Sequence, residues 1–219
     1  MSPDLSATQQ SLIFWAFFLA LAGILIFLDQ KYKMLRDTSL AVKKPYSFAR
    51  VQLAWWTVIV LASFITIMIT KHAIPTFDSS TLVLLGISAA TTGVARVIDQ
   101  SAQSNPATSM ALAQGQEGQG IFLDILSDGT GPNMHRFQTV VFNAVFGIWF
   151  IAAVLHNLPQ CPQVHCNDLI SCINCTDVAQ KAAYNYIIPK ICDNNLILLG
   201  LSAGTYAALK TTENKPAAN

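Results

Sequence analysis

The chain has 219 residues, of which 53% are hydrophobic and only 11% charged, and its formal net charge is +1. Soluble domains carry about 25% charged residues, so this composition leaves too little polar surface for a water-soluble globule. It indicates a membrane protein. The near-neutral charge, without a basic stripe, excludes nucleic acid as a partner.

Five runs are predicted to cross a membrane as helices, which takes about 17–25 mostly apolar residues. In chain order they cover 11–28, 51–70, 79–95, 137–155 and 194–209. The third is short and rich in small residues, and the fifth is the shortest. No Lys or Arg precedes the first run, so we interpret it as a retained helix rather than a cleaved signal peptide.

The basic residues predict the orientation of these spans. Five spans place ten Lys and Arg on one side: Lys31, Lys33, Arg36, Lys43, Lys44, Arg50, Arg96, Arg136, Lys210 and Lys215. The other side holds three: Lys71, Lys181 and Lys190. Cytoplasmic loops are enriched in Lys and Arg, which predicts a plasma (inner) membrane protein with its N-terminus outside and its C-terminus in the cytoplasm. Trp15, Trp55 and Trp56 lie near span ends, where we expect them at the level of the lipid headgroups.

An internal repeat organises the chain. Residues 73–89 (AIPTFDSSTLVLLGISA) align without a gap with 187–203 (IIPKICDNNLILLGLSA), and Arg-x-Gln opens the preceding span in both cases, at 50–52 and 136–138. The alignment predicts a duplicated helical hairpin with an Ile-Pro turn, in which both copies run in the same direction. The predicted fold is an all-α membrane bundle of one leading helix and two tandem hairpins.

This organisation divides the chain into five segments. Residues 1–50 hold the leading helix and a basic cytoplasmic loop, and 51–98 hold the first hairpin. Residues 99–135 form a cytoplasmic linker, 136–210 the second hairpin with a Cys-rich exterior insertion at 158–192, and 211–219 a cytoplasmic tail.

Small residues cluster in the third and fifth spans. Small side chains at i and i+4 allow two helices to approach closely in lipid. We therefore expect these residues either to pack helices within the chain or to line an oligomer axis or a pore. They are Gly86, Ser88, Ala90, Gly93, Gly200, Ser202 and Gly204.

Two polar residues, Asn143 and its repeat counterpart Thr57, lie inside spans. Such side chains seldom face lipid, so each is expected to join helices or to contact a permeating solute. The centres of the predicted spans hold no Asp, Glu, Lys or Arg. Because coupled transporters usually need such groups, this pattern disfavours coupled transport.

All five cysteines fall in the second exterior loop or at its edge: Cys161, Cys166, Cys172, Cys175 and Cys192. In an oxidising exterior, clustered cysteines favour disulfides, although the pairing cannot be read from sequence. Together with His165 they also offer a zinc site, but the spacing is unlike that of known zinc fingers. We predict disulfides and no metal.

The cytoplasmic linker has two parts. Its first part is polar and looks flexible. In the second, Phe122, Leu123, Ile125 and Leu126 alternate with Asp124 and Asp128. This pattern is typical of a short amphipathic helix at a membrane surface. Two further interpretations are a loop end tucked under the bundle and an element that binds a partner.

Four stretches, SFARVQLAWW, LLGISAATTGVARVID, FLDILSDGTGPNMHRFQ and LLGLSAGTYAALK, resemble recurring stretches of uncharacterised prokaryotic multi-pass membrane proteins. The resemblance covers 46–210 and implies the fold and an inner-membrane location, but no activity. The sequence has no nucleotide-binding glycine loop, HExxH or GxSxG motif, so we expect neither an enzyme nor a cofactor.

The predicted function is a non-enzymatic membrane protein that forms a homo-oligomer through its small-residue helices, with a pore or channel as one outcome. One alternative is a membrane scaffold that docks partner proteins through its exterior and cytoplasmic loops. Another is a small-solute uniporter.

Overall fold

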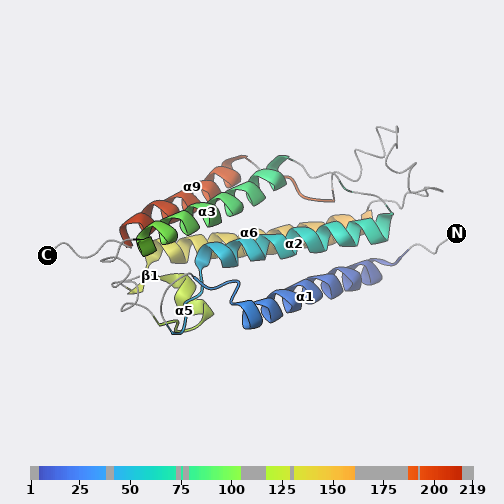
Figure 1. Ribbon diagram of the computed structural model, residues 1–219. Coiled ribbons are helices and arrows are strands. Elements are labelled where there is room, and N and C mark those ends of the chain that lie inside the picture. Colours follow the sequence, from blue (N-terminus) through green and yellow to red (C-terminus); the bar gives the residue numbers. More distant parts are fainter. Residues whose placement is uncertain are drawn as a thin grey trace.

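A computed structural model describes residues 5–37, 42–72, 75, 79–104, 117–128, 131–160, 187–191 and 193–213. Five long helices dominate this part of the chain (Figure 1): α1 (Ala7–Tyr32), α2 (Phe48–Lys71), α3 (Ser79–Ser104), α6 (Met134–Asn157) and α9 (Asp193–Glu213). The shorter elements are α5 (Ile121–Leu126), the 3-10 turn η1 (Leu158–Gln160), and the antiparallel strands β1 (Ser127–Asp128) and β2 (Gly131–Pro132). The chain is therefore mostly helical, as predicted.

Four helices are long and apolar enough to cross a membrane: α1, α2, residues Ser79–Ile98 of α3, and Met134–Gln160, which covers α6 and η1. These four helices are compatible with a membrane protein. The fifth predicted span is helical as α9, but it is not among the four. Polar and small residues interrupt its apolar run, and Asp193 and Glu213 lie at its two ends.

Local signals explain where α1 begins and ends. The Ser6 side chain accepts a hydrogen bond from the Gln9 amide at 3.3 Å, and the Gln9 side chain accepts one from the Ser6 amide at 2.9 Å. This reciprocal capping box satisfies amides that the helix itself leaves free. At the other end, Lys33 adopts a left-handed conformation with φ 54°, and its amide bonds to the Asp29 carbonyl, which terminates the helix.

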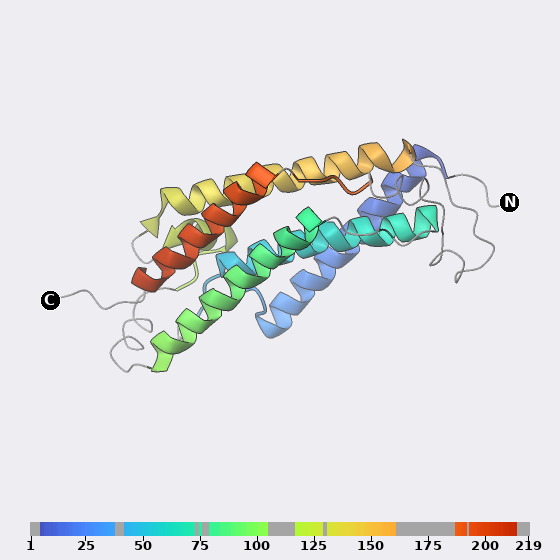
Figure 2. The same ribbon diagram turned by 90° about the horizontal axis from the view of Figure 1, so that it is seen from above.

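Four of the long helices pack in two layers. Helices α2 and α6 lie side by side in one layer, and α3 and α9 form the second (Figures 1 and 2). Helix α3 packs on α2 and contacts α9, which packs on α6. Helix α1 lies against α2. Both α3 and α9 begin about half-way along α2 and α6 and run past their first residues.

A hydrogen bond between helices fixes this offset for α3. The Thr92 hydroxyl donates to the Ala49 carbonyl at 3.1 Å, so Thr92 lies beside the first turn of α2. The remainder of α3, to Ser104, extends beyond that end of α2. The apolar part of α3, Ser79–Ile98, agrees with the predicted span over 79–95. The helix itself is longer, because helical structure continues through the polar residues that follow the apolar run.

The chain before α9 enters the core as a turn at Ile187 and Ile188 followed by irregular backbone. Ile187, Ile188 and Ile191 are at most 2% exposed and pack with Trp56 and Leu84. The Ile191 amide donates to the Ser80 hydroxyl at 3.1 Å. The predicted Ile-Pro turn is thus a buried segment in the second copy. Non-helical backbone is tolerated at membrane depth only where protein or an aqueous cavity surrounds it.

Trp55 and Trp56, expected at the level of the lipid headgroups, pack inside the bundle. Trp56 is fully buried, and its ring meets that of Phe150 edge-to-face at 6.2 Å between centroids. Trp55 is half-buried and packs against the same core. Both indoles find hydrogen-bond acceptors inside the bundle, so neither needs the membrane surface. Trp15 is 41% exposed, so part of its ring lies on the outer surface of the bundle.

Candidate functional site

Asn143 is the centre of the buried polar contacts between α2 and α6. The Trp56 indole N–H donates to Asn143 Oδ1 at 2.8 Å, and Asn143 Nδ2 donates to the Thr139 carbonyl at 2.8 Å. The Trp55 indole donates to the Asn143 backbone carbonyl at 3.1 Å. Asn143 is 5% exposed. Its amide therefore joins helices, the first of the two roles expected for it.

Thr139 extends this contact to α9. The Ser202 hydroxyl donates to the Thr139 hydroxyl at 2.5 Å, and Thr139 donates to the His135 carbonyl at 2.8 Å. Ser88, the repeat counterpart of Ser202, is 1% exposed, and its hydroxyl has no hydrogen-bond partner. The two serines therefore occupy different environments, although their sequence contexts match.

Gly147 allows α2 and α6 to approach closely. A Cβ at this position would lie 2.6 Å from Cε2 of Trp55, which no real Cβ contact tolerates. Sequence analysis missed this residue. The signal was a single glycine in a span otherwise filled with large side chains, facing a helix with two adjacent tryptophans.

Thr57 has a different role from its counterpart Asn143. Its hydroxyl donates to the Leu53 carbonyl in its own helix at 2.7 Å. Ser63, Thr66 and Thr70 make the same bond four residues back, also at 2.7 Å. These bonds satisfy the hydroxyls locally, and the structure does not bring Thr57 to Asn143.

The small residues of α3 form an exposed face. Gly86, Ala90 and Gly93 are all exposed, and a Cβ built on Gly86 or Gly93 would meet no atom within 4 Å. Val94 and Val97 continue this face at 47% and 65% exposed. We call Gly86, Ala90, Gly93 and Val97 the α3 face. Among the described residues, none lies within 4 Å of a Cβ built on Gly86 or Gly93 of this face.

The equivalent residues of α9 divide between two roles. A Cβ on Gly200 would lie 3.5 Å from Cδ1 of Ile87, so this glycine faces α3. Gly204 is exposed, with no atom within 4 Å of a Cβ. Of the small residues singled out in the sequence, Gly200 packs inside the chain, whereas Gly86, Gly93 and Gly204 do not.

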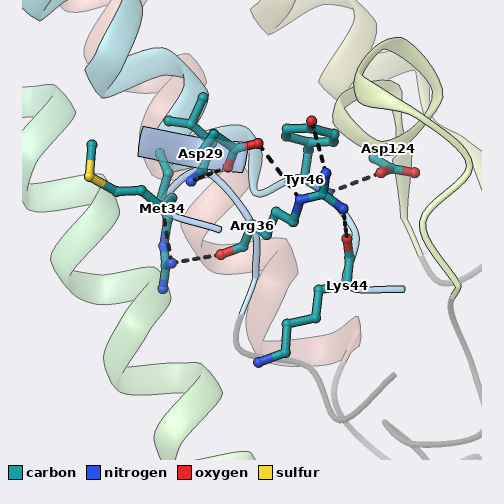
Figure 3. A network of polar contacts seen from close by, with 8 residues as sticks. Asp29, Met34, Arg36, Lys44, Tyr46 and Asp124 are labelled. Atoms are coloured by element: carbon teal, nitrogen blue, oxygen red, sulfur yellow. Dashed lines mark hydrogen bonds and ion pairs between the residues drawn. The ribbon is translucent and has the colours of Figure 1, made fainter. Parts of the chain in front are cut away.

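A polar network lies at the end of α1 (Figure 3). Asp29, 4% exposed, accepts a hydrogen bond from the Leu35 amide at 2.9 Å and lies 3.7 Å from Nε of Arg36. The Arg36 guanidinium stacks over the Tyr46 ring at 4.7 Å and donates to its hydroxyl at 3.2 Å. Burial, with the negative charge of Asp29, raises the pKa of Tyr46 above its ordinary value, so its hydroxyl stays protonated.

The same network holds α5. Asp124 accepts hydrogen bonds from the amides of Tyr46 at 3.0 Å and Gln119 at 2.7 Å. The Gly118 amide donates to the Lys43 carbonyl at 2.7 Å. Sequence analysis missed these contacts. The available signal was an acid, Asp29, at the end of an apolar run followed by basic residues.

Two predictions concern residues outside the described ranges. All five cysteines and His165 lie there, so the structure describes neither disulfides nor a zinc site. Within the described residues, no group of three or more His, Cys, Asp or Glu is arranged to hold a metal ion.

Comparison with known proteins identifies no relative: no family model, curated protein or solved structure matches the chain. The class of the protein therefore follows from its own architecture, a helical bundle with four helices apolar enough to span a membrane.

Proposed function

We propose that the protein is an integral membrane protein that self-associates through the α3 face. The observation that carries the proposal is the exposure of Gly86, Ala90 and Gly93 on one side of a helix apolar enough to span the membrane. These residues are four and three positions apart, so they share one helix face.

Lipid makes this face suited to a second helix. Apolar side chains gain little from leaving lipid for each other, so helices associate through close packing and hydrogen bonds. A face without bulky side chains brings two backbones near enough for both, including weak Cα–H···O contacts. Since no described segment covers Gly86 or Gly93, a second copy of α3 is the simplest partner.

A pore along the shared axis is the functional extension of this proposal. Copies that meet through α3 would surround an axis with small residues, which leaves space between the helices. No residue of this arrangement is assigned a catalytic step. Ion flux through the purified protein in liposomes tests the extension separately from the association.

The test of association is substitution of the α3 face. We expect Gly86→Leu with Gly93→Leu to convert the oligomer to monomer, because two Leu side chains would separate the backbones. Gly23→Leu is the matched control, since Gly23 is also an exposed helical glycine with no atom within 4 Å of a Cβ.

The measurement is subunit number in lipid nanodiscs, by mass photometry or single-molecule photobleaching. Gly23→Leu should keep the native number. If the double variant also keeps it, association does not use the α3 face. If the native protein is monomeric, the proposal fails outright.

A further inference from the structure

Helix α5 presents apolar side chains to the outside. Ile121, Phe122 and Leu123 are 38%, 76% and 48% exposed, whereas Ile125 is 8% exposed and packs against α2 and α3 residues. We call Ile121, Phe122 and Leu123 the outer face of α5. Ile125 thus holds the helix against the bundle, while none of the described residues covers its outer face.

No described charge belongs to this outer face. The acid within the helix, Asp124, points toward Tyr46 (Figure 3). Its two carboxylate oxygens accept the Tyr46 and Gln119 amides. These bonds hold the charge on the inner side, so burying the outer face in lipid would not carry a carboxylate with it.

An exposed apolar stripe on α6 begins at the end of the bundle where α5 packs. Helix α5 packs against α2 and α6 and lies just beyond the last residues of α1 (Figure 1). From this end, the exposed apolar residues of α6 run up the helix into its apolar span: Met134 (74%), Phe137 (50%), Val141 (38%), Val145 (56%) and Ile148 (62%). If lipid covers α6, the same leaflet reaches α5.

Basic side chains lie at the end of α1 and in the connection that bonds to the chain just before α5. Lys43 is exposed and Lys44 is half-buried. The Lys43 carbonyl accepts a hydrogen bond from the Gly118 amide, two residues before the N-cap residue of α5. Lys31 and Lys33 are exposed at the end of α1. Of the nearby acids, Glu117 is exposed and Asp37 half-buried, so the four lysines outnumber these two. Apolar residues flanked by lysines bind surfaces that carry anionic lipid.

We propose that the outer face of α5 inserts among the headgroups of the adjacent leaflet and there contacts anionic phospholipid. The inference rests on the membrane location in the proposed function, but not on self-association. Helix α5 then anchors the end of the bundle, and the network around Asp29 and Asp124 holds it at the required depth.

The experiment is photo-cross-linking from single positions of the full-length protein. A benzophenone amino acid replaces Phe122, or Ile148 as the lipid-facing reference, or Gln100 as the water-facing control. Gln100 is exposed on the part of α3 that extends beyond α2. Each variant is illuminated in nanodiscs of mixed phosphatidylglycerol and phosphatidylcholine, and the adducts are identified by intact-protein mass spectrometry.

We expect lipid adducts at position 122 at a yield within about threefold of position 148 and about tenfold above position 100, with phosphatidylglycerol over-represented, as for an interfacial helix. Adducts at 122 that join two protein copies, or a lipid yield equal to that at 100, would overturn the proposal. If position 148 also gives no lipid adduct, the membrane location itself is wrong.

Discussion

At the scale of single residues, equivalent positions of the repeat make different contacts. Asn143 bonds across to Trp56, whereas Thr57 bonds only to its own helix. The polar residue inside α6 was recognisable in the sequence, because Asn seldom faces lipid. Its partner was not, since a tryptophan near a span end fits the headgroup region equally well.

This difference gives a prediction with an internal control. We expect Asn143→Leu to lower the free energy of unfolding by about 1–2 kcal/mol, because it leaves the buried Trp56 N–H without an acceptor. Thr57→Val removes a hydroxyl bonded within its own helix, so its effect should stay within about 0.5 kcal/mol. Reversible unfolding in mixed micelles, followed by circular dichroism, measures both. Equal losses would show that the Asn143–Trp56 contact adds nothing.

At the scale of elements, the connection between α1 and α2 is built as one unit with α5. Arg36 is its main linker, with contacts to Asp29, Tyr46 and the Lys44 carbonyl. The amides around α5 depend on this arrangement, since Tyr46 holds both Arg36 and Asp124.

Arg36→Ala should therefore loosen α5 as well as destabilise the fold. Removing the guanidinium leaves Asp29 buried without its cation, a loss of about 1–3 kcal/mol for a pair that is partly screened by solvent. Lys31→Ala is the matched control, because Lys31 is exposed and carries the same charge. Hydrogen exchange by mass spectrometry should show faster exchange at 117–128 for Arg36→Ala only. Unchanged exchange there would contradict the coupling.

The elements themselves were largely predictable. Apolar runs located α1, α2 and α6, and the alternation at 121–126 located α5. The length of α3 was not predictable from hydropathy, because residues 96–104 are polar and their helical structure continues one that packing against α2 and α9 supports. The α3 face illustrates the same limit. Spacing showed that Gly86 and Ala90 share a face, but only the packed structure shows that the described residues leave this face uncovered.

At the scale of the whole molecule, the repeat accounts for which helices pack against each other. It does not account for how deeply the segment before α9 is buried. Residues 73–89 and 187–203 match, and each contains the start of a helix that packs on the preceding long one. The Ile-Pro sequence predicts a turn, and the structure has one at Ile187, but its burial was not predicted. That burial depends on residues of α1, α2, α3, α6 and α9 that join Ile187 in one core cluster, which no local pattern encodes.

The two ends of the bundle also differ in charge, which predicts orientation. The connections from α1 to α2 and from α5 to α6 meet at one end (Figure 1), and Lys31, Lys33, Lys43, Lys44 and Arg136 all belong to that end. A cytoplasmic location for it follows from the distribution of Lys and Arg in membrane proteins. We therefore predict that the opposite end, where η1 ends at Gln160, faces an oxidising exterior.

Thiol labelling of intact cells tests this orientation. If the five cysteines lie outside, two disulfides should leave about one thiol open to a membrane-impermeant alkylating reagent, and reduction should raise the number to five. The labelled thiols are counted by mass spectrometry after purification. A cysteine-free variant carrying Gln100→Cys is the control for the other end, and it should label only after lysis. Labelling of Gln100→Cys in intact cells, with the five native thiols protected until lysis, would invert the orientation and place the basic end outside.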